Sequence, residues 1–298
     1  PAAEWNAALA SVVSVIRPLV APLLPRAESR TVFPLRAVPR APLRFDNGVG
    51  GMSVDDEYHM AVHGDHLPPA PWANVIANPH GGFLVSERGG GCMWAENAYF
   101  FRVTPWHNDP VSDPPGDVIF LQELDAGDLW SATPAPVRGD VVYDVQHAAG
   151  STTFSHERAN LTTELTLGMP DDAAVKVSMV RLHNRSGRTR RLVVTAYAEW
   201  TLGAHREDTR HQITTRYLSE AGAIVAQNHF DPAFSGWTAY LATSEPVTSY
   251  TADRRSFLGP QGHLSRPAAL ALDGLDLATG AGLDRGHPKP ADRKSTRL

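Results

Sequence analysis

The stretch AVKVSMVRLHNRSGRTRRLVVTAYAEW, residues 174–200, indicates the kind of fold that the chain adopts. Its second half alternates two sets of side chains, Leu192, Val194, Ala196, Ala198 and Trp200 against Val193, Thr195, Tyr197 and Glu199. A period of two is typical of a β-strand that buries one face. The intervening HNRSGRT contains Asn184 and Gly187, residue types that tolerate positive φ. The stretch is therefore predicted to form a β-hairpin.

Similar strand patterns recur along most of the chain. They occupy residues 44–51, 75–87, 116–124, 139–150, 151–169, 212–220, 222–230 and 237–245. Turn residues separate them, in keeping with 24 glycines and 24 prolines, and no helical pattern lies between them. The sequence therefore predicts an all-β fold, a large antiparallel β-sandwich.

The beginning of the chain has a different pattern. Within residues 1–24, apolar side chains recur at helical spacings of three and four. Arg17, Pro18 and Pro22 interrupt this run, so that neither a membrane span nor one long helix is predicted. We expect a short helical segment, and no signal peptide, because no basic start precedes the apolar run.

Four regions follow from these patterns. Residues 1–24 form the short helical segment, and the proline- and arginine-rich residues 25–42 form a linker. Residues 43–290 form the sandwich, which is expected to be truncated at its end. Residues 291–298 resemble nothing earlier in the chain and are predicted to be a non-native tail.

Composition excludes several classes of function. The formal net charge of −5 argues against a nucleic-acid partner, which requires a basic surface. The single cysteine, Cys92, rules out an internal disulfide framework. His63 and His66 in HGDH precede prolines that prevent a shared helical face, so we expect no metal site there. No cofactor is predicted.

The segment WAENAYFFRVTPWHNDPVSDPP, residues 94–115, is the candidate binding site. It combines aromatic rings with directional polar groups, and the candidate substrate-binding residues are Trp94, Asn97, Arg102, Trp106, Asn108 and Asp109. Sugars present apolar C–H faces to rings and hydroxyls to fixed donors and acceptors. The alternative is a rigid loop that packs on its own sandwich with its tryptophans buried.

Catalytic groups are not predicted in this chain. Ser112, His107 and Asp109 could be assembled into a triad by spacing, but no nucleophile-elbow glycines flank the serine. Asp109 and Asp113 precede prolines, where a carboxylate typically builds a turn through its side chain. A glycosidase needs two carboxyl groups on opposite sides of a sugar, which proximity in sequence does not supply.

Three blocks of the sequence resemble a known family. They are NGVGGMSVDDEYHM at 47–60, PPAPWANVIANPHGGFLVSERGGGCMWAENAYFFRVTPWHNDPVSDPPGD at 68–117, and VRLHNRSGRTRRLVVTAYAEWTLG at 180–203. They are similar to the inverting glycoside phosphorylases related to cellobiose phosphorylase, and most of all to the phosphorylase-like module of cyclic β-1,2-glucan synthase. The resemblance covers roughly residues 43–290.

This resemblance implies a non-catalytic part of a larger enzyme. In that family an N-terminal β-sandwich precedes a helical toroid, whose aspartate acts as general acid while phosphate attacks. The implied partners are a β-glucan oligosaccharide, the missing toroid and a second copy in a full-length homodimer. The implied location is the cytoplasm, either free or as part of an inner-membrane synthase. The alternative is a purely structural interaction domain without sugar affinity.

Overall fold

The computed structural model of the chain describes residues 42–281, apart from 65, 233–234, 261, 272–273, 276 and 278. The predicted helical segment 1–24, nearly all of the linker 25–42 and the tail 291–298 lie outside the described residues. No helix in the described part is long and apolar enough to cross a membrane. The boundaries drawn for the four regions therefore stay predictions.

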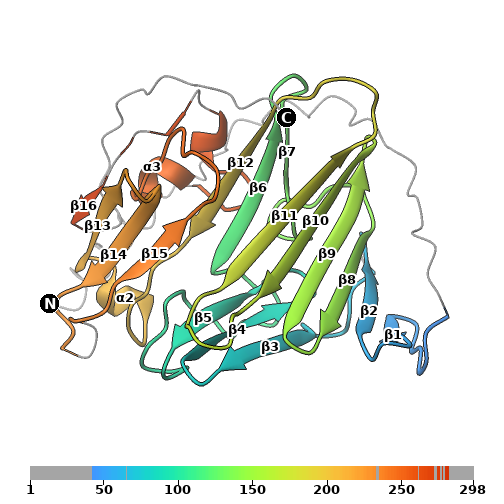
Figure 1. Cartoon of the computed structure of the whole chain (residues 1–298), viewed down its shortest axis with the longest axis horizontal. Helices are drawn as coiled ribbons and strands as arrows, with labels where there is room; N and C mark the ends of the chain where they lie inside the picture. The colour runs from blue at the N-terminus through green and yellow to red at the C-terminus, as the bar shows by residue number, and fades with distance from the viewer. Residues whose placement is uncertain are drawn as a thin grey trace, which may run out of the picture. The chain divides into compact units, whose positions relative to one another are not determined.

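The predicted all-β architecture is confirmed. The largest sheet has the antiparallel order β1-β2-β8-β9-β10-β11, and Figure 1 shows β8 to β11 side by side. Its strands are β1 (Gly50–Met52), β2 (Tyr58–Val62), β8 (Tyr143–Ala148), β9 (Ser151–Arg158), β10 (Leu161–Gly168) and β11 (Val177–Asn184).

Three smaller sheets complete the described fold. Their orders are β3-β4-β5, β12-β6-β7 and β15-β14-β13-β16. The strands are β3 (Ala73–Asn78), β4 (Gly81–Ser86), β5 (Gly91–Ala95), β6 (Asp117–Glu123), β7 (Asp128–Ser131), β12 (Leu192–Ala198), β13 (Ile213–Leu218), β14 (Ala223–Asn228), β15 (Ala239–Ala242) and β16 (Gly280–Ala281). The short helical elements are α2 (Arg206–Thr209), α3 (Arg254–Leu258) and the 3-10 turn η1 (Ala268–Ala271).

The main core lies between the six-stranded sheet and strands of two smaller sheets. Phe154 of β9 belongs to one buried cluster with Phe83 of β4 and Leu121 of β6. Alternate residues of β6 face the other way, where Val118 and Phe120 pack against α3. Because strand side chains alternate between faces, β6 is buried on both sides and joins the two clusters.

The predicted hairpin at 174–200 is wrong in its pairing, although both strands exist. β11 pairs with β10 in the six-stranded sheet, whereas β12 pairs with β6 in a smaller one. The alternation at Leu192–Ala198 specifies which face is buried but not which strand lies alongside. The connecting residues 185–191 also exceed the two to five that hairpin loops usually contain. They carry the chain from one sheet to another.

Two shorter hairpins lie largely within the strand patterns at 75–87 and 151–169. β3 and β4 pair across Pro79 and His80, where Asn78 Oδ1 accepts hydrogen bonds from the backbone N–H groups of His80 and Gly81. β9 and β10 pair across Ala159 and Asn160, both at positive φ, as tight hairpin turns require.

Candidate functional site

The candidate loop, residues 94–115, leaves the end of β5 and returns to the start of β6. Its two ends are fastened together, because Gly91 bridges Pro115 and the Gly116 N–H donates to Gly91 O at 3.1 Å. Buried Thr104 accepts a hydrogen bond from the Met93 N–H through its hydroxyl, at 2.8 Å. We call residues 94–95 and 102–105 the neck of the loop and residues 113–115 its base. The two exposed parts are the turn (residues 96–101) and the tip (residues 106–112).

Two of the predicted site residues stabilise the turn. Asn97 Oδ1 accepts from the backbone N–H groups of Tyr99 at 2.9 Å and Phe100 at 3.0 Å. Arg102 donates from Nε to Ala98 O at 3.1 Å and from Nη1 to Ala204 O at 3.0 Å. Their polar groups are therefore engaged with backbone atoms of the chain itself.

Trp94 has a packing contact that the sequence did not reveal. A Cβ built on Gly82 would lie 2.4 Å from Trp94 Cζ2, so the indole rests directly against the backbone of β4. The side chain is half-buried. Part of the indole ring consequently lies against the sandwich.

The tip contains the other three predicted residues. Trp106 is half-buried, while Asn108, at a φ of +49°, and Asp109 are exposed. Asp109 Oδ1 accepts from the Val111 N–H at 2.9 Å, and Ser112 Oγ donates to Asp109 Oδ2 at 2.5 Å. The bond from Ser112 and the two backbone N–H groups lower the pKa of Asp109 below its usual range. The prediction that Asp109 builds a turn is confirmed.

Two buried carboxyl groups, Asp113 of the loop and Glu87 of the β4–β5 turn, lie at the base of the loop. Asp113 is 4% exposed and accepts from Ser86 Oγ at 2.5 Å, and burial raises its pKa. Glu87 is 1% exposed and accepts from the Trp72 N–H at 2.8 Å. Burial raises the pKa of Glu87 to about 7, with the charge of Asp113 adding to the effect. The Asp113–Ser86 bond fixes the base of the loop to β4, and the Glu87–Trp72 bond joins the β4–β5 turn to the residues before β3.

The structure thus separates the six predicted residues into two groups. Trp94, Asn97 and Arg102 lie in the neck and turn, and Trp106, Asn108 and Asp109 lie in the tip. The sequence did not single out Tyr99 and Phe100 among the aromatic residues of the segment, and it did not reveal His205, whose ring contacts that of Tyr99. No local signal in the sequence places residue 205 beside residue 99.

The rings of His63 and His66, the histidines of HGDH, lie close together. Their rings stack at 5.2 Å and their backbones form a bridge, His66 N–H donating to His63 O at 2.8 Å. Across the described part of the chain, no group of three or more His, Cys, Asp or Glu side chains is arranged to hold a metal ion.

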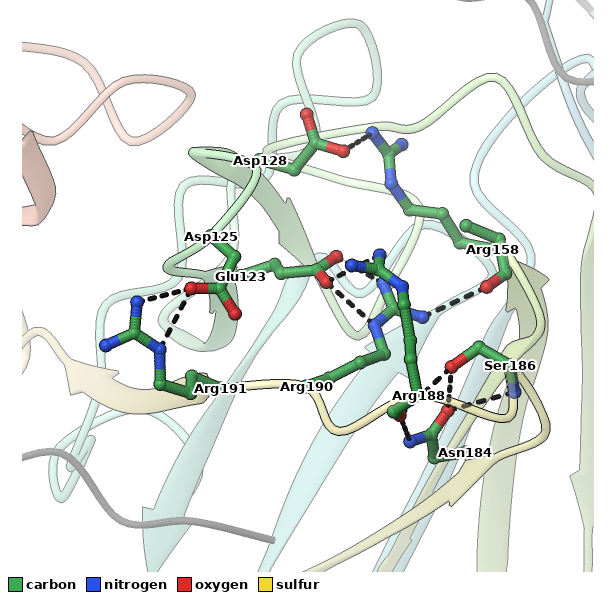
Figure 2. Close-up of polar contacts among 10 residues, drawn as sticks. Glu123, Asp125, Asp128, Arg158, Asn184, Ser186, Arg188, Arg190 and Arg191 are labelled. Carbon is green, nitrogen blue, oxygen red and sulfur yellow. Dashed lines mark hydrogen bonds and ion pairs between the residues drawn. The ribbon is translucent and has the colours of Figure 1, made fainter.

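A buried ionic cluster, shown in Figure 2, lies outside the candidate loop. Glu123 and Arg190 are each 2% exposed, and Arg190 binds the carboxylate through Nε and Nη2. Arg190 Nη1 also donates to Ala159 O, and Arg188 Nη2 donates to Glu123 Oε1 at 3.1 Å. We call this set of contacts the Glu123–Arg190 clamp. It ties the 185–191 connection to β6 and to the β9–β10 turn.

Antiparallel sheets that share a buried core make the described fold a large β-sandwich, and the candidate loop lies on its surface. Residues 56–285 match the family described as "Glycosyl hydrolase 94, supersandwich domain". The chain therefore belongs to this family, and the resemblance noted in the sequence is confirmed.

Named relatives give the same assignment. The chain is 31% identical over 268 residues to the cyclic beta-(1,2)-glucan synthase NdvB of Rhizobium meliloti (strain 1021), which covers 89% of this chain and 9% of that protein. It is 25% identical over 211 residues to an N,N'-diacetylchitobiose phosphorylase of Vibrio furnissii, covering 68% and 26%. It is 24% identical over 208 residues to a solabiose phosphorylase of Paenibacillus borealis, covering 68% and 27%. The chain spans about a quarter or less of each relative.

Proposed function

We propose that this chain is a non-catalytic scaffold domain of a β-glucan-active phosphorylase or cyclic β-1,2-glucan synthase. It binds or shapes a carbohydrate site that is completed by a helical catalytic domain elsewhere in the whole protein. In that domain phosphate serves as the nucleophile, so one carboxylic acid there suffices. The cytoplasmic location and the homodimer expected from the resemblance belong to the same proposal.

The observation that carries the proposal is the architecture of the 94–115 loop. The neck and base hold the loop in one conformation through Thr104, Asp113 and the bridges, while the turn and tip remain exposed. A loop that is already ordered loses less conformational entropy when a ligand binds. We therefore expect the loop to form a stiff rim of the carbohydrate site.

The relatives support the choice of ligand. Their names include a β-(1,2)-glucan synthase and two disaccharide phosphorylases, all of them acting on short or cyclic sugars. A β-1,2-linked gluco-oligosaccharide is accordingly the first ligand to test. Chitobiose and cello-oligosaccharides serve as comparisons for linkage and substituent.

Isothermal titration of the isolated chain with β-1,2-gluco-oligosaccharides tests the proposal. We expect weak, saturable binding with a dissociation constant on the order of 1 mM, because only one wall of the complete site is present. A flat titration at several millimolar oligosaccharide would contradict sugar binding and favour the alternative, a structural interaction domain. Assaying phosphate release from glucose 1-phosphate and an acceptor tests the non-catalytic part, and we expect none.

A further inference from the structure

Two adjacent rings on the turn are exposed although they are held in fixed positions. Tyr99 and Phe100 keep 49% and 59% of their surface exposed, and their rings meet edge-to-face at 4.9 Å and 88°. His205, just before α2, meets Tyr99 at 5.8 Å and 90°, and the Tyr99 hydroxyl lies 3.4 Å from His205 Nε2. We call Tyr99, Phe100 and His205 the platform.

Contacts from Arg102 and Asn97 support the platform. The guanidinium of Arg102 lies 5.1 Å from the centre of the Tyr99 ring while it donates to Ala98 O and Ala204 O. Asn97 fixes the backbone N–H groups of both aromatic residues. A cation over a ring and a capped turn both restrict the orientation of Tyr99. The rings are therefore presented in one arrangement before any ligand arrives.

Within the turn, this exposure is confined to two of the three aromatic rings. Phe101 turns inward, packs in the cluster of Trp200 and Ile213, and meets Trp237 at 5.9 Å. The apolar surface left open by Tyr99 and Phe100 lies beside polar atoms, the Tyr99 hydroxyl and the His205 ring. A small apolar face with adjacent donors and acceptors fits a pyranose ring better than a large protein surface.

We propose that Tyr99, Phe100 and His205 form the surface on which a sugar ring stacks. This inference rests on the proposed function and assigns its contact residues. Asn97 and Arg102 then act as positioning residues, because their polar groups are used to hold the turn. Trp94 packs against Gly82 and supports the neck from inside.

Matched alanine variants test the assignment. In titrations with β-1,2-gluco-oligosaccharides, Tyr99→Ala and Phe100→Ala are each expected to weaken binding about tenfold, since each removes one of the two exposed ring contacts. Tyr240→Ala and Phe230→Ala remove rings of similar exposure outside the platform, 52% and 74% exposed, and are expected to bind like the parent chain. Circular dichroism confirms that each variant is folded.

The conservative variant Tyr99→Phe separates the ring from its hydroxyl. It is expected to keep most of the affinity, because the stacking face remains. If Tyr99→Phe lost as much affinity as Tyr99→Ala, the hydroxyl and not the ring would carry the contact, and stacking would be wrong. If Tyr99→Ala does not fold, the affinity of Tyr99→Phe still shows whether the hydroxyl carries the contact.

The remaining outcomes distinguish this inference from the proposed function. If the parent chain binds sugar and both platform variants bind equally well, the platform is wrong while the proposed function stands. If the parent chain binds no sugar, both fail. Concentration-dependent self-association that Tyr99→Ala abolishes, without any response to sugar, would identify a protein as the occupant and overturn the platform.

Discussion

Two irregular segments of the molecule perform the same topological task with different chemistry. The connection 185–191 leads from β11 of the six-stranded sheet to β12, and the loop 94–115 leads from β5 to β6, again between different sheets. In the first, charged side chains are buried against one another in the Glu123–Arg190 clamp. In the second, polar side chains bind nearby backbone atoms and aromatic rings remain exposed.

The difference shows where stability and recognition reside. A buried charge that loses its partner is left uncompensated at low dielectric, so the clamp supports the fold. An exposed ring contributes little to the folded state and keeps its apolar face available to a ligand. We therefore expect substitutions in the clamp to change the free energy of unfolding, and substitutions in the platform or tip to change sugar binding.

The largest expected effect is on stability, from Glu123→Gln. The change leaves Arg190 buried without a counter-charge and should lower the free energy of unfolding by about 3–5 kcal/mol. Urea denaturation measures it. Asp125→Ala is the control, because Asp125 pairs with Arg191 at the surface, and no measurable change is expected there. A loss below about 1 kcal/mol in Glu123→Gln would mean that the clamp does not hold the connection.

The base of the candidate loop should respond next. A Cβ on Gly90 would lie 2.1 Å from Asp113 Oδ1, so Gly90→Ala must displace that buried carboxyl group. We expect a loss of about 1–3 kcal/mol in urea denaturation, as overpacking usually produces. Gly236→Ala is the control, because a Cβ there meets nothing within 4 Å. Equal stability of the two variants would show that the base is loosely packed.

Glu87 should make stability depend on pH. Its pKa in the folded chain is about 7, above its usual 4.5, so between these values the unfolded state is ionised while the folded state keeps its proton. Stability should therefore fall as pH rises from about 5 to 7, by roughly 1–2 kcal/mol. Buried His156, with a pKa of about 3, acts in the opposite direction below pH 6.5.

The Glu87 contribution can be isolated as the difference between the parent chain and Glu87→Gln. Urea denaturation of both at several pH values cancels what His156 contributes. The difference in the free energy of unfolding should change across pH 5–7 and become constant above about pH 8. A constant difference across the whole range would show that Glu87 is ionised in the folded chain throughout.

The smallest effect on stability is expected in the tip, from Trp106→Ala. Because Trp106 is half-buried and lies in an exposed segment, its loss should affect unfolding less than Gly90→Ala does. In the whole enzyme, by contrast, turnover should fall more than stability. Activity and thermal unfolding of the same variant measure both. If melting temperature and activity fell in proportion, Trp106 would serve packing and not the rim.

The sequence predicted individual strands well and their pairing less well. The alternation at Leu192–Ala198 identified β12, but its partner, β6, lies about 70 residues earlier and is determined by packing on both faces. Glu123 gave no sign of its burial, since its counter-charge Arg190 comes from another part of the chain. Residue type alone likewise did not distinguish exposed Tyr99 from inward-facing Phe101.

Amide chemical-shift mapping of the isolated chain during titration with a β-1,2-gluco-oligosaccharide tests the central claim most directly. We expect saturable shifts concentrated in residues 97–112 and around His205, with residues 185–191 unchanged. Saturable shifts centred on the Glu123–Arg190 clamp, or a spectrum that does not change at several millimolar sugar, would contradict it.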